Sequence, residues 1–197
     1  MYTGLLLLVA VLLVVLNGLF VAAEFYFVES RKTRLELLAD GGSKRAVTAL
    51  FGIHNLDAYL SVCQLGITLS SLGLGWLGEP AVAALLRPVL ELAGISNPAV
   101  VSSVSVAVGF TIITLLHVVF GELVPKSISI QRAEATVLLL AFPMKLFYFL
   151  CYPVVTVMNG ISNFILPLAG LSSASESEQT HSPEELRMLI LDSGREG

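Results

Sequence analysis

Charged residues are scarce in this chain and unevenly spread. Asp, Glu, Lys and Arg make up 13% of the 197 residues, against about a quarter in a typical soluble domain. They gather in three segments, 29–45, 122–134 and 176–196, and hydrophobic residues, 55% of the total, dominate the stretches between them. This pattern excludes an ordinary soluble enzyme domain. It predicts an all-α integral membrane protein whose helices have apolar middles.

Residues that commonly carry chemistry are also few. The two cysteines, Cys63 and Cys151, lie far apart within apolar segments, and they are expected to be buried small hydrophobic residues. The three histidines show no spacing typical of a zinc site. No nucleophile–base pair, phosphate-binding loop or basic patch stands out, so the sequence predicts neither an enzyme nor a nucleic-acid partner.

The first apolar run covers residues 4–23, which as a helix is long enough to cross about 30 Å of hydrocarbon. A cleaved signal peptide is the alternative, but such peptides begin with a basic segment and have a core of about 7–15 residues. Here only Met-Tyr-Thr precedes the run, and the basic segment 31–34 follows it. The positive-inside rule therefore predicts an external N-terminus and a cytoplasmic flank after the first helix.

Glycines, prolines and apolar patterning indicate the remaining helices. Residues 33–52 alternate apolar and polar positions at helical spacing around a glycine pair, which predicts two short helices in the membrane interface. Crossing helices are predicted over 56–77 and 98–124, and a short external helix and turn over 79–94. The last apolar stretch, 135–171, is long enough to cross but contains three prolines.

Polar residues recur on one face of each predicted crossing helix. In the first helix they are Asn17 and Glu24. In the second and third helices they are Gln64, Thr68, Ser71 and Gly75, and Thr114, His117 and Gly121. Such groups are costly in a membrane and mark either a ligand path or close helix packing, and the stripes alone leave both interpretations open. His117 has no His or Cys partner at ligand spacing and is predicted to be a hydrogen-bonded core or pore-adjacent residue.

The segment Gly121-Glu122-Leu123-Val124-Pro125 favours a ligand site. Pro125 has no N–H, so it cannot bond the carbonyl four residues earlier, which belongs to Gly121. A free carbonyl beside Glu122, with Asn and Ser side chains facing it, makes an all-oxygen set that suits Mg²⁺, Ca²⁺ or Na⁺ better than zinc or copper. Alternatively, Pro125 ends the helix and Glu122 pairs with Lys126 one turn later.

Several motifs are distinctive when taken together: NGLFVAAEF, ESRKTRLELL, QLGITLSSLGLGWLGEP, HVVFGELVPKS and SPEELRMLI. They extend over essentially the whole chain and resemble the transmembrane (DUF21) domain of the CorC/CNNM family. The resemblance implies a homodimeric magnesium transporter that exchanges Mg²⁺ outward against inward Na⁺. It also implies paired cytosolic CBS domains, outside this chain, through which ATP and Mg²⁺ regulate transport.

The same resemblance implies an ion site. Its ligands, carried over position by position, are Asn17, Ser70, Ser71, Gly121 and Glu122. Further positions on the ion pathway are Glu24, Gln64 and Pro125. Animal members of the family have Ser at the position of Asn17 and Asn at that of Ser71, and they have a second Ser where this chain has Val21. Val21 can contribute only its backbone.

The family topology also assigns the last apolar stretch. CBS domains bind cytosolic nucleotide, so a fourth crossing would place them outside the cell, and 135–171 is expected to form a proline-broken helical hairpin on the cytoplasmic side. We therefore predict three crossings, a transmembrane domain over 1–171 and a cytosolic linker leading into the CBS pair over 172–197. Residues 182–185 (SPEE) have the features of a helix start, so a folded soluble region is expected to follow.

Two rival functions fit the same residues. One is a membrane sensor or scaffold that binds Mg²⁺ and regulates another transporter, which needs the ion site but no alternating access. The other is a transporter of a different divalent cation, such as Co²⁺ or Mn²⁺.

The predicted topology can be tested by labelling in intact cells. In a cysteine-free background, Ser96→Cys is expected to react with a membrane-impermeant thiol reagent, and Ser175→Cys is expected to resist it until the cells are opened. Labelling of Ser175→Cys from outside would show that the chain crosses the membrane four times in this orientation.

Overall fold

The structure is a computed structural model, described here for residues 2–30, 32–95 and 97–168, and it confirms the all-α class. Within these ranges the chain forms helices and no strand. The helices are α1 (Tyr2–Glu29), α2 (Lys32–Asp40), α3 (Lys44–His54), α4 (Leu56–Leu92), α5 (Pro98–Leu116), the π-helix η1 (His117–Leu123), α6 (Val124–Gln131) and α7 (Ala133–Leu168). The chain divides into two compact units, Met1–Val155 and Thr156–Gly197. The predicted linker, 172–197, lies outside the described residues.

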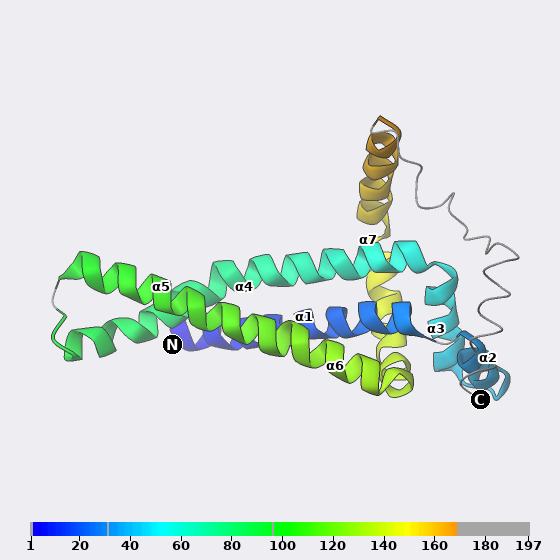
Figure 1. Ribbon diagram of the computed structural model, residues 1–197, viewed down its shortest axis with the longest axis horizontal. Coiled ribbons are helices and arrows are strands. Elements are labelled where there is room, and N and C mark those ends of the chain that lie inside the picture. Colours follow the sequence, from blue (N-terminus) through cyan, green and yellow to red (C-terminus); the bar gives the residue numbers. More distant parts are fainter. Residues whose placement is uncertain (1, 31, 96, 169–197) are drawn as a thin grey trace, which may run out of the picture. The chain divides into compact units, whose positions relative to one another are not determined.

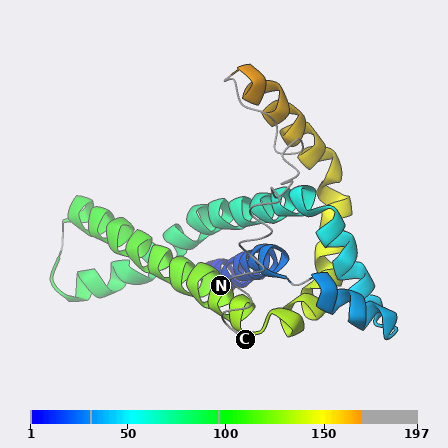
Figure 2. The same cartoon turned by 45° about the vertical axis from the view of Figure 1, so that its right-hand side comes forward.

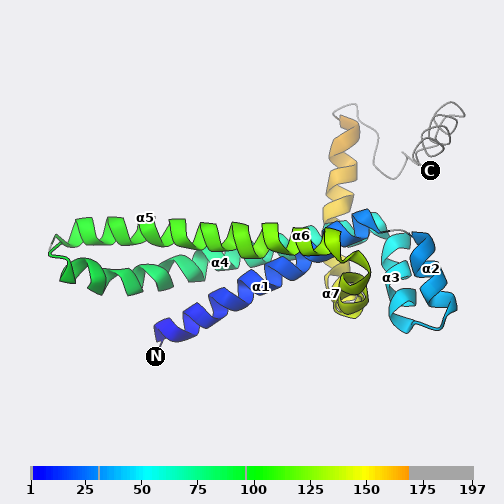
Figure 3. The same ribbon diagram turned by 60° about the horizontal axis from the view of Figure 1, so that its bottom comes forward.

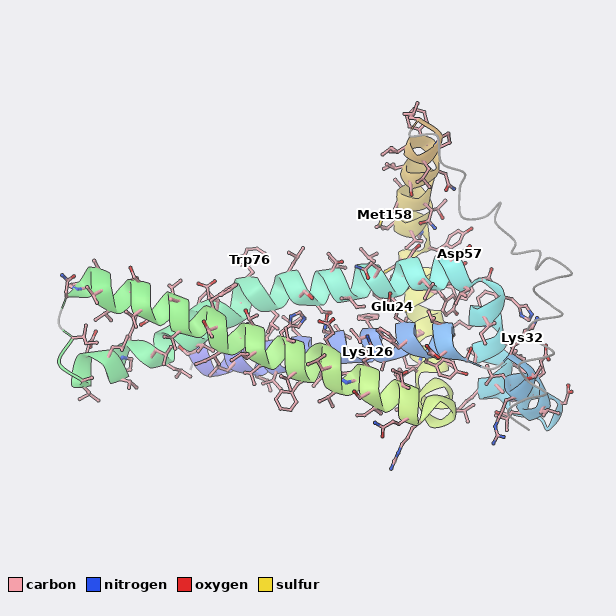
Figure 4. The ribbon with its side chains drawn as sticks, in the orientation of Figure 1. Glu24, Lys32, Asp57, Trp76, Lys126 and Met158 are labelled. Carbon is pink, nitrogen blue, oxygen red and sulfur yellow. The ribbon has the colours of Figure 1, made fainter. Side chains whose placement is uncertain are left out.

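Four described segments are long and apolar enough to cross a membrane. They are Thr3–Glu29, Leu56–Leu92, Pro98–Gln131 and Leu138–Leu168. Large apolar side chains are exposed along them, including Trp76, which is 82% exposed and points outward from α4 (Figure 4). An apolar exterior of this kind belongs in lipid, so the protein is a multi-pass membrane protein.

Within the first unit, α1, α4 and the α5–α6 segment run lengthwise beside one another (Figures 1 and 3). α4 packs against α5 near the loop that joins them, and α1 packs against α4, η1 and α6. Toward the end that carries α2 and α3, α1 lies between α4 and the η1–α6 segment (Figure 2). Three membrane helices therefore meet around the middle of α1.

The prediction for the second crossing helix was wrong in its length. We expected it to stop near residue 77 and a separate external helix to follow, but α4 continues through Pro80 and Pro88. An internal proline removes only one backbone hydrogen bond and can be absorbed as a kink. Close packing on α5 supports this stretch, because a Cβ at Gly109 would lie only 3.2 Å from the backbone nitrogen of Ala83.

The predicted hairpin over 135–171 was also wrong within the described residues. α7 is one helix that includes Pro143 and Pro153. The residues between these prolines contain no Gly, Asn or Asp, which are the residues that usually form a tight turn. Side chains from this part of α7 pack instead on the other helices, as Phe147 does on Phe20 of α1 at 4.7 Å between ring centroids.

The two short helices after α1 agree with the prediction. Gly42 has a φ of +90°, a conformation that glycine adopts readily, and it separates α2 from α3. Ser43 then caps α3, its hydroxyl accepting a hydrogen bond from the N–H of Ala46 at 3.3 Å. A 3.9 Å ion pair between Lys32 and Glu36 lies on the exposed side of α2.

Aromatic residues form the core at the α2–α3 end of the first unit. Tyr59 of α4 is fully buried and stacks on Tyr148 of α7, with ring centroids 4.8 Å apart. Phe51 of α3 and Phe27 of α1 contact the same tyrosine edge-on. Four helices are thus joined by one cluster. Both cysteines are buried as predicted.

The close packing of α1 on α4 predicts a sharp contrast between two glycines of α4. A Cβ at Gly66 would lie 2.6 Å from the ring of Phe20, whereas a Cβ at Gly75 meets nothing within 4 Å. Gly66→Ala is expected to lower the free energy of unfolding by about 1–3 kcal/mol, because the ring of Phe20 is itself held by packing. Gly75→Ala is the matched control and should not destabilise, because Ala favours helix over Gly. Equal thermal midpoints for the two variants in detergent would contradict the described contact.

Candidate ion-binding site

Asn17 is the central polar residue of the bundle. It lies in the middle of α1 and is 1% exposed. Its side-chain Nδ2 donates a hydrogen bond of 2.9 Å to the carbonyl oxygen of Gly121 in η1. A buried amide needs such partners, so this bond fixes both the rotamer of Asn17 and the distance between the two helices.

Pro125 explains why the Gly121 carbonyl accepts this bond. Proline at position 125 cannot donate to the carbonyl four residues earlier, and the side chain of Asn17 does so instead. The absence of a side chain at Gly121 is equally necessary, because a Cβ there would lie 3.0 Å from Cδ2 of His117 and 3.1 Å from Nδ2 of Asn17. As predicted, the Gly121 carbonyl receives no hydrogen bond from residue 125. It accepts one from the side-chain amide of Asn17 instead.

Ser71 of α4 connects the third helix to this pair. Its Oγ lies 3.2 Å from Oδ1 of Asn17 and 3.1 Å from Nε2 of His117. The Gly121 carbonyl can only accept, so Nδ2 of Asn17 must face Gly121 and Oδ1 must face Ser71. A polar chain therefore runs from His117 through Ser71 and Asn17 to Gly121, and it links α4, α1 and η1.

The π-helix η1 places two of these four residues. Hydrogen bonds in a π-helix run from residue i+5 to residue i, which makes each turn wider than in an α-helix, and such turns are frequent at functional sites. The N–H of Val124 accordingly donates to the carbonyl of Val119. Pro125 does not end the helix, as one interpretation of the sequence held, because α6 continues to Gln131.

Glu122 lies outside this polar chain. Its side chain is exposed, and within the described residues it has no hydrogen bond or ion pair. The alternative pairing with Lys126 is not made, because Nζ of Lys126 lies over the ring of Phe25, 4.2 Å from its centroid. The carboxylate is therefore adjacent in sequence to the polar chain but not part of it.

The other predicted positions lie near the polar chain without joining it. Ser70 is buried at 2% exposure beside Ser71. Gln64 is exposed on α4, and Glu24 is half-buried on α1 toward the α2–α3 end (Figure 4). Val21 is buried among the α1 residues of the core.

Sequence reasoning undervalued His117. It was predicted to be hydrogen-bonded or pore-adjacent, and the structure places its Nε2 against Ser71, directly at the predicted site. The available signal was its position four residues before Gly121, which puts both on one helix face. Among the described residues no group of three or more His, Cys, Asp and Glu comes together, so the donors here are amide, hydroxyl and carbonyl oxygens with one imidazole.

A double-mutant cycle tests the link between Pro125 and Asn17. Asn17→Leu is expected to destabilise the protein by about 1–3 kcal/mol, because it leaves the buried Gly121 carbonyl without a donor. Pro125→Ala supplies an N–H at position 125, so the double variant should lose less stability than the sum of the single variants. Strictly additive changes in thermal midpoint would show that the two residues do not share this carbonyl.

Comparisons with known proteins agree with this architecture. Residues 8–197 match the family described as "Cyclin M transmembrane N-terminal domain" (CNNM). The chain is 48% identical to UPF0053 protein YhdT and 44% identical to UPF0053 protein YugS, both of Bacillus subtilis, over 94% of its length. It is 40% identical over 96% of its length to the uncharacterized protein Rv1841c of Mycobacterium tuberculosis.

The chain spans only part of these relatives: 40% of YhdT, 43% of YugS and 54% of Rv1841c. The family match nevertheless covers nearly all of the present chain, including all four residues of the polar chain. The resemblance to the CorC/CNNM family is therefore confirmed, and the chain belongs to the cyclin M (CNNM) transmembrane domain family.

Proposed function

We propose that this domain carries divalent cations across the membrane and that Mg²⁺ is its substrate. The observation that supports the proposal best is the hydrogen-bonded chain of Gly121, Asn17 and Ser71, which links oxygen atoms from three membrane segments. Two neighbouring ligands of octahedral Mg²⁺, each about 2.0–2.1 Å from the metal, lie about 3 Å apart. Oδ1 of Asn17 and Oγ of Ser71 are 3.2 Å apart, so they need to move little to share one ion.

Charge balance requires a carboxylate in addition to these neutral groups, because a divalent ion at membrane depth is costly without a counter-charge. We assign this role to Glu122. Glu122 directly follows Gly121 in η1, so a local change in the conformation of η1 would change the direction of its side chain. Ion binding would turn the exposed Glu122 toward Asn17 and Ser71, and the buried Ser70 is a further candidate ligand.

The direction and coupling of transport form the finer part of the proposal. We propose Mg²⁺ efflux coupled to Na⁺ entry, in a homodimer in the cell membrane. Of the four candidate spans, the first three would cross and α7 would lie on the cytoplasmic side, with the N-terminus outside and the C-terminus in the cytoplasm. Glu24 and the exposed Gln64 lie between the polar chain and the α2–α3 end, where Glu24 could serve Na⁺ or the cytoplasmic opening. ATP would act only through regulatory domains beyond this chain.

The assignment of Glu122 can be tested by binding and flux of the same purified variants. Glu122→Gln is expected to abolish Mg²⁺ binding in calorimetric titration and Mg²⁺ flux in proteoliposomes, because it removes the counter-charge without changing size. Asn17→Ala and Ser71→Ala should weaken binding by roughly tenfold, since each removes one neutral ligand. Glu91→Gln, an exposed carboxylate on α4, is the matched control and should behave like the parent.

Three outcomes would contradict parts of this proposal. Parent-like binding by Glu122→Gln, with loss in Glu24→Gln, would place the site nearer Glu24. Binding without flux under any Na⁺ gradient would favour a Mg²⁺ sensor or scaffold over a transporter. Flux of Co²⁺ or Mn²⁺ without flux of Mg²⁺ would favour a transporter of a different divalent cation.

A further inference from the structure

We propose that His117 is a nitrogen ligand of the transported cation and that it sets the selectivity of the site. This inference rests on the proposed cation site at Asn17 and Ser71 and adds a donor that the all-oxygen hypothesis did not contain. Its consequence is that the site accepts first-row transition-metal divalent ions alongside Mg²⁺.

The two distances at Ser71 each fit a pair of cis ligands of one ion. Nε2 of His117 and Oδ1 of Asn17 lie on either side of Oγ of Ser71, at 3.1 and 3.2 Å. Both distances are close to the spacing of about 3 Å between adjacent ligands of a six-coordinate ion with bonds near 2.1 Å. The imidazole nitrogen therefore already lies at ligand spacing from Oγ of Ser71.

The surroundings hold the imidazole in this position. His117 is the first residue of η1, and its ring packs on the Cα of Gly121, where a Cβ would lie 3.0 Å from Cδ2. Any larger residue at 121 would push the ring away from Ser71. Gly121 thus has two roles, one through its carbonyl on Asn17 and one through the space that it leaves for His117.

The chemistry of the donor set predicts the selectivity. Imidazole nitrogen binds first-row divalent ions more strongly along the series from Mn²⁺ to Cu²⁺, whereas Mg²⁺ prefers oxygen. Ni²⁺ and Mg²⁺ have nearly equal radii and both favour octahedral coordination. The ratio of their affinities therefore reports the type of donor and not the size of the site.

The experiment compares Ni²⁺ and Mg²⁺ binding in protein that lacks other imidazoles. His54 is exposed at the end of α3, and His181 is the third histidine of the chain. Both are changed to Gln to give the reference protein, which is purified without a histidine tag. His117→Gln is then added, because its side-chain amide can occupy the place of Nε2 and still bond to Ser71.

We expect His117→Gln to lower the Ni²⁺-to-Mg²⁺ affinity ratio by at least about tenfold while the Mg²⁺ affinity changes little. In the Mn²⁺-loaded reference protein, electron spin echo modulation should show a directly bound ¹⁴N, and this signal should be lost in His117→Gln. An unchanged ratio, an equal loss of both affinities, or no ¹⁴N signal would overturn the inference and leave His117 as a hydrogen-bond partner of Ser71. A reference protein that binds neither ion would instead contradict the proposed function itself.

Discussion

The hydrogen bond between Nδ2 of Asn17 and the Gly121 carbonyl is the interaction on which the rest of the site depends. It exists because Pro125 cannot supply the backbone donor that a helix would normally provide. The segment just before Pro125 is the π-helix η1, which presents His117 and Gly121 together. Pro125 thereby leaves a carbonyl acceptor through which Asn17 ties this segment to α1. The same hydrogen bond therefore belongs to the polar chain and joins two of the packed helices.

Small residues let the helices come close enough for these bonds. A Cβ at Gly18 would lie 2.8 Å from Cγ of Pro125 in α6 and 3.3 Å from the carbonyl oxygen of Phe120 in η1, so α1 touches both segments directly beside Asn17. One helical turn beyond Pro125, the hydroxyl of Ser129 donates a 2.7 Å hydrogen bond to the carbonyl of Ala22, which fixes α6 on α1. In lipid such close contacts replace the hydrophobic effect as the source of helix association. These contacts hold α1 against η1 and α6 beside the polar chain, while Glu122 of the same turn is exposed.

Much of this could be predicted from the sequence, and the failures have physical causes. Features that depend on local chemistry were predictable. The apolar runs predicted the membrane class, and the glycine pair before α3 predicted the two short helices. The Gly121–Pro125 spacing predicted that the Gly121 carbonyl lacks its usual backbone donor. The lengths of α4 and α7 depend on tertiary packing. Packing against other helices stabilises a helix at internal prolines that would end it in isolation. The spacing of His117 and Gly121 indicated a shared helix face, but the contact of Nε2 of His117 with Ser71 depends on how η1 is placed beside α4, which residue spacing alone does not reveal. The exposed position of Glu122 also depends on tertiary structure, namely on which face of η1 lies against α1.

The central claim is that one cation binds among Asn17, Ser71 and the Gly121 turn. The most direct measurement is the anomalous scattering of Mn²⁺ in crystals of the protein, since Mn²⁺ shares the octahedral oxygen chemistry of Mg²⁺ and its position can be located independently of the protein atoms. The account predicts an anomalous peak within about 2.0–2.4 Å of both Oδ1 of Asn17 and Oγ of Ser71, with Glu122 turned toward it. A peak at Glu24, or at an exposed Glu122 away from Asn17, would contradict the account.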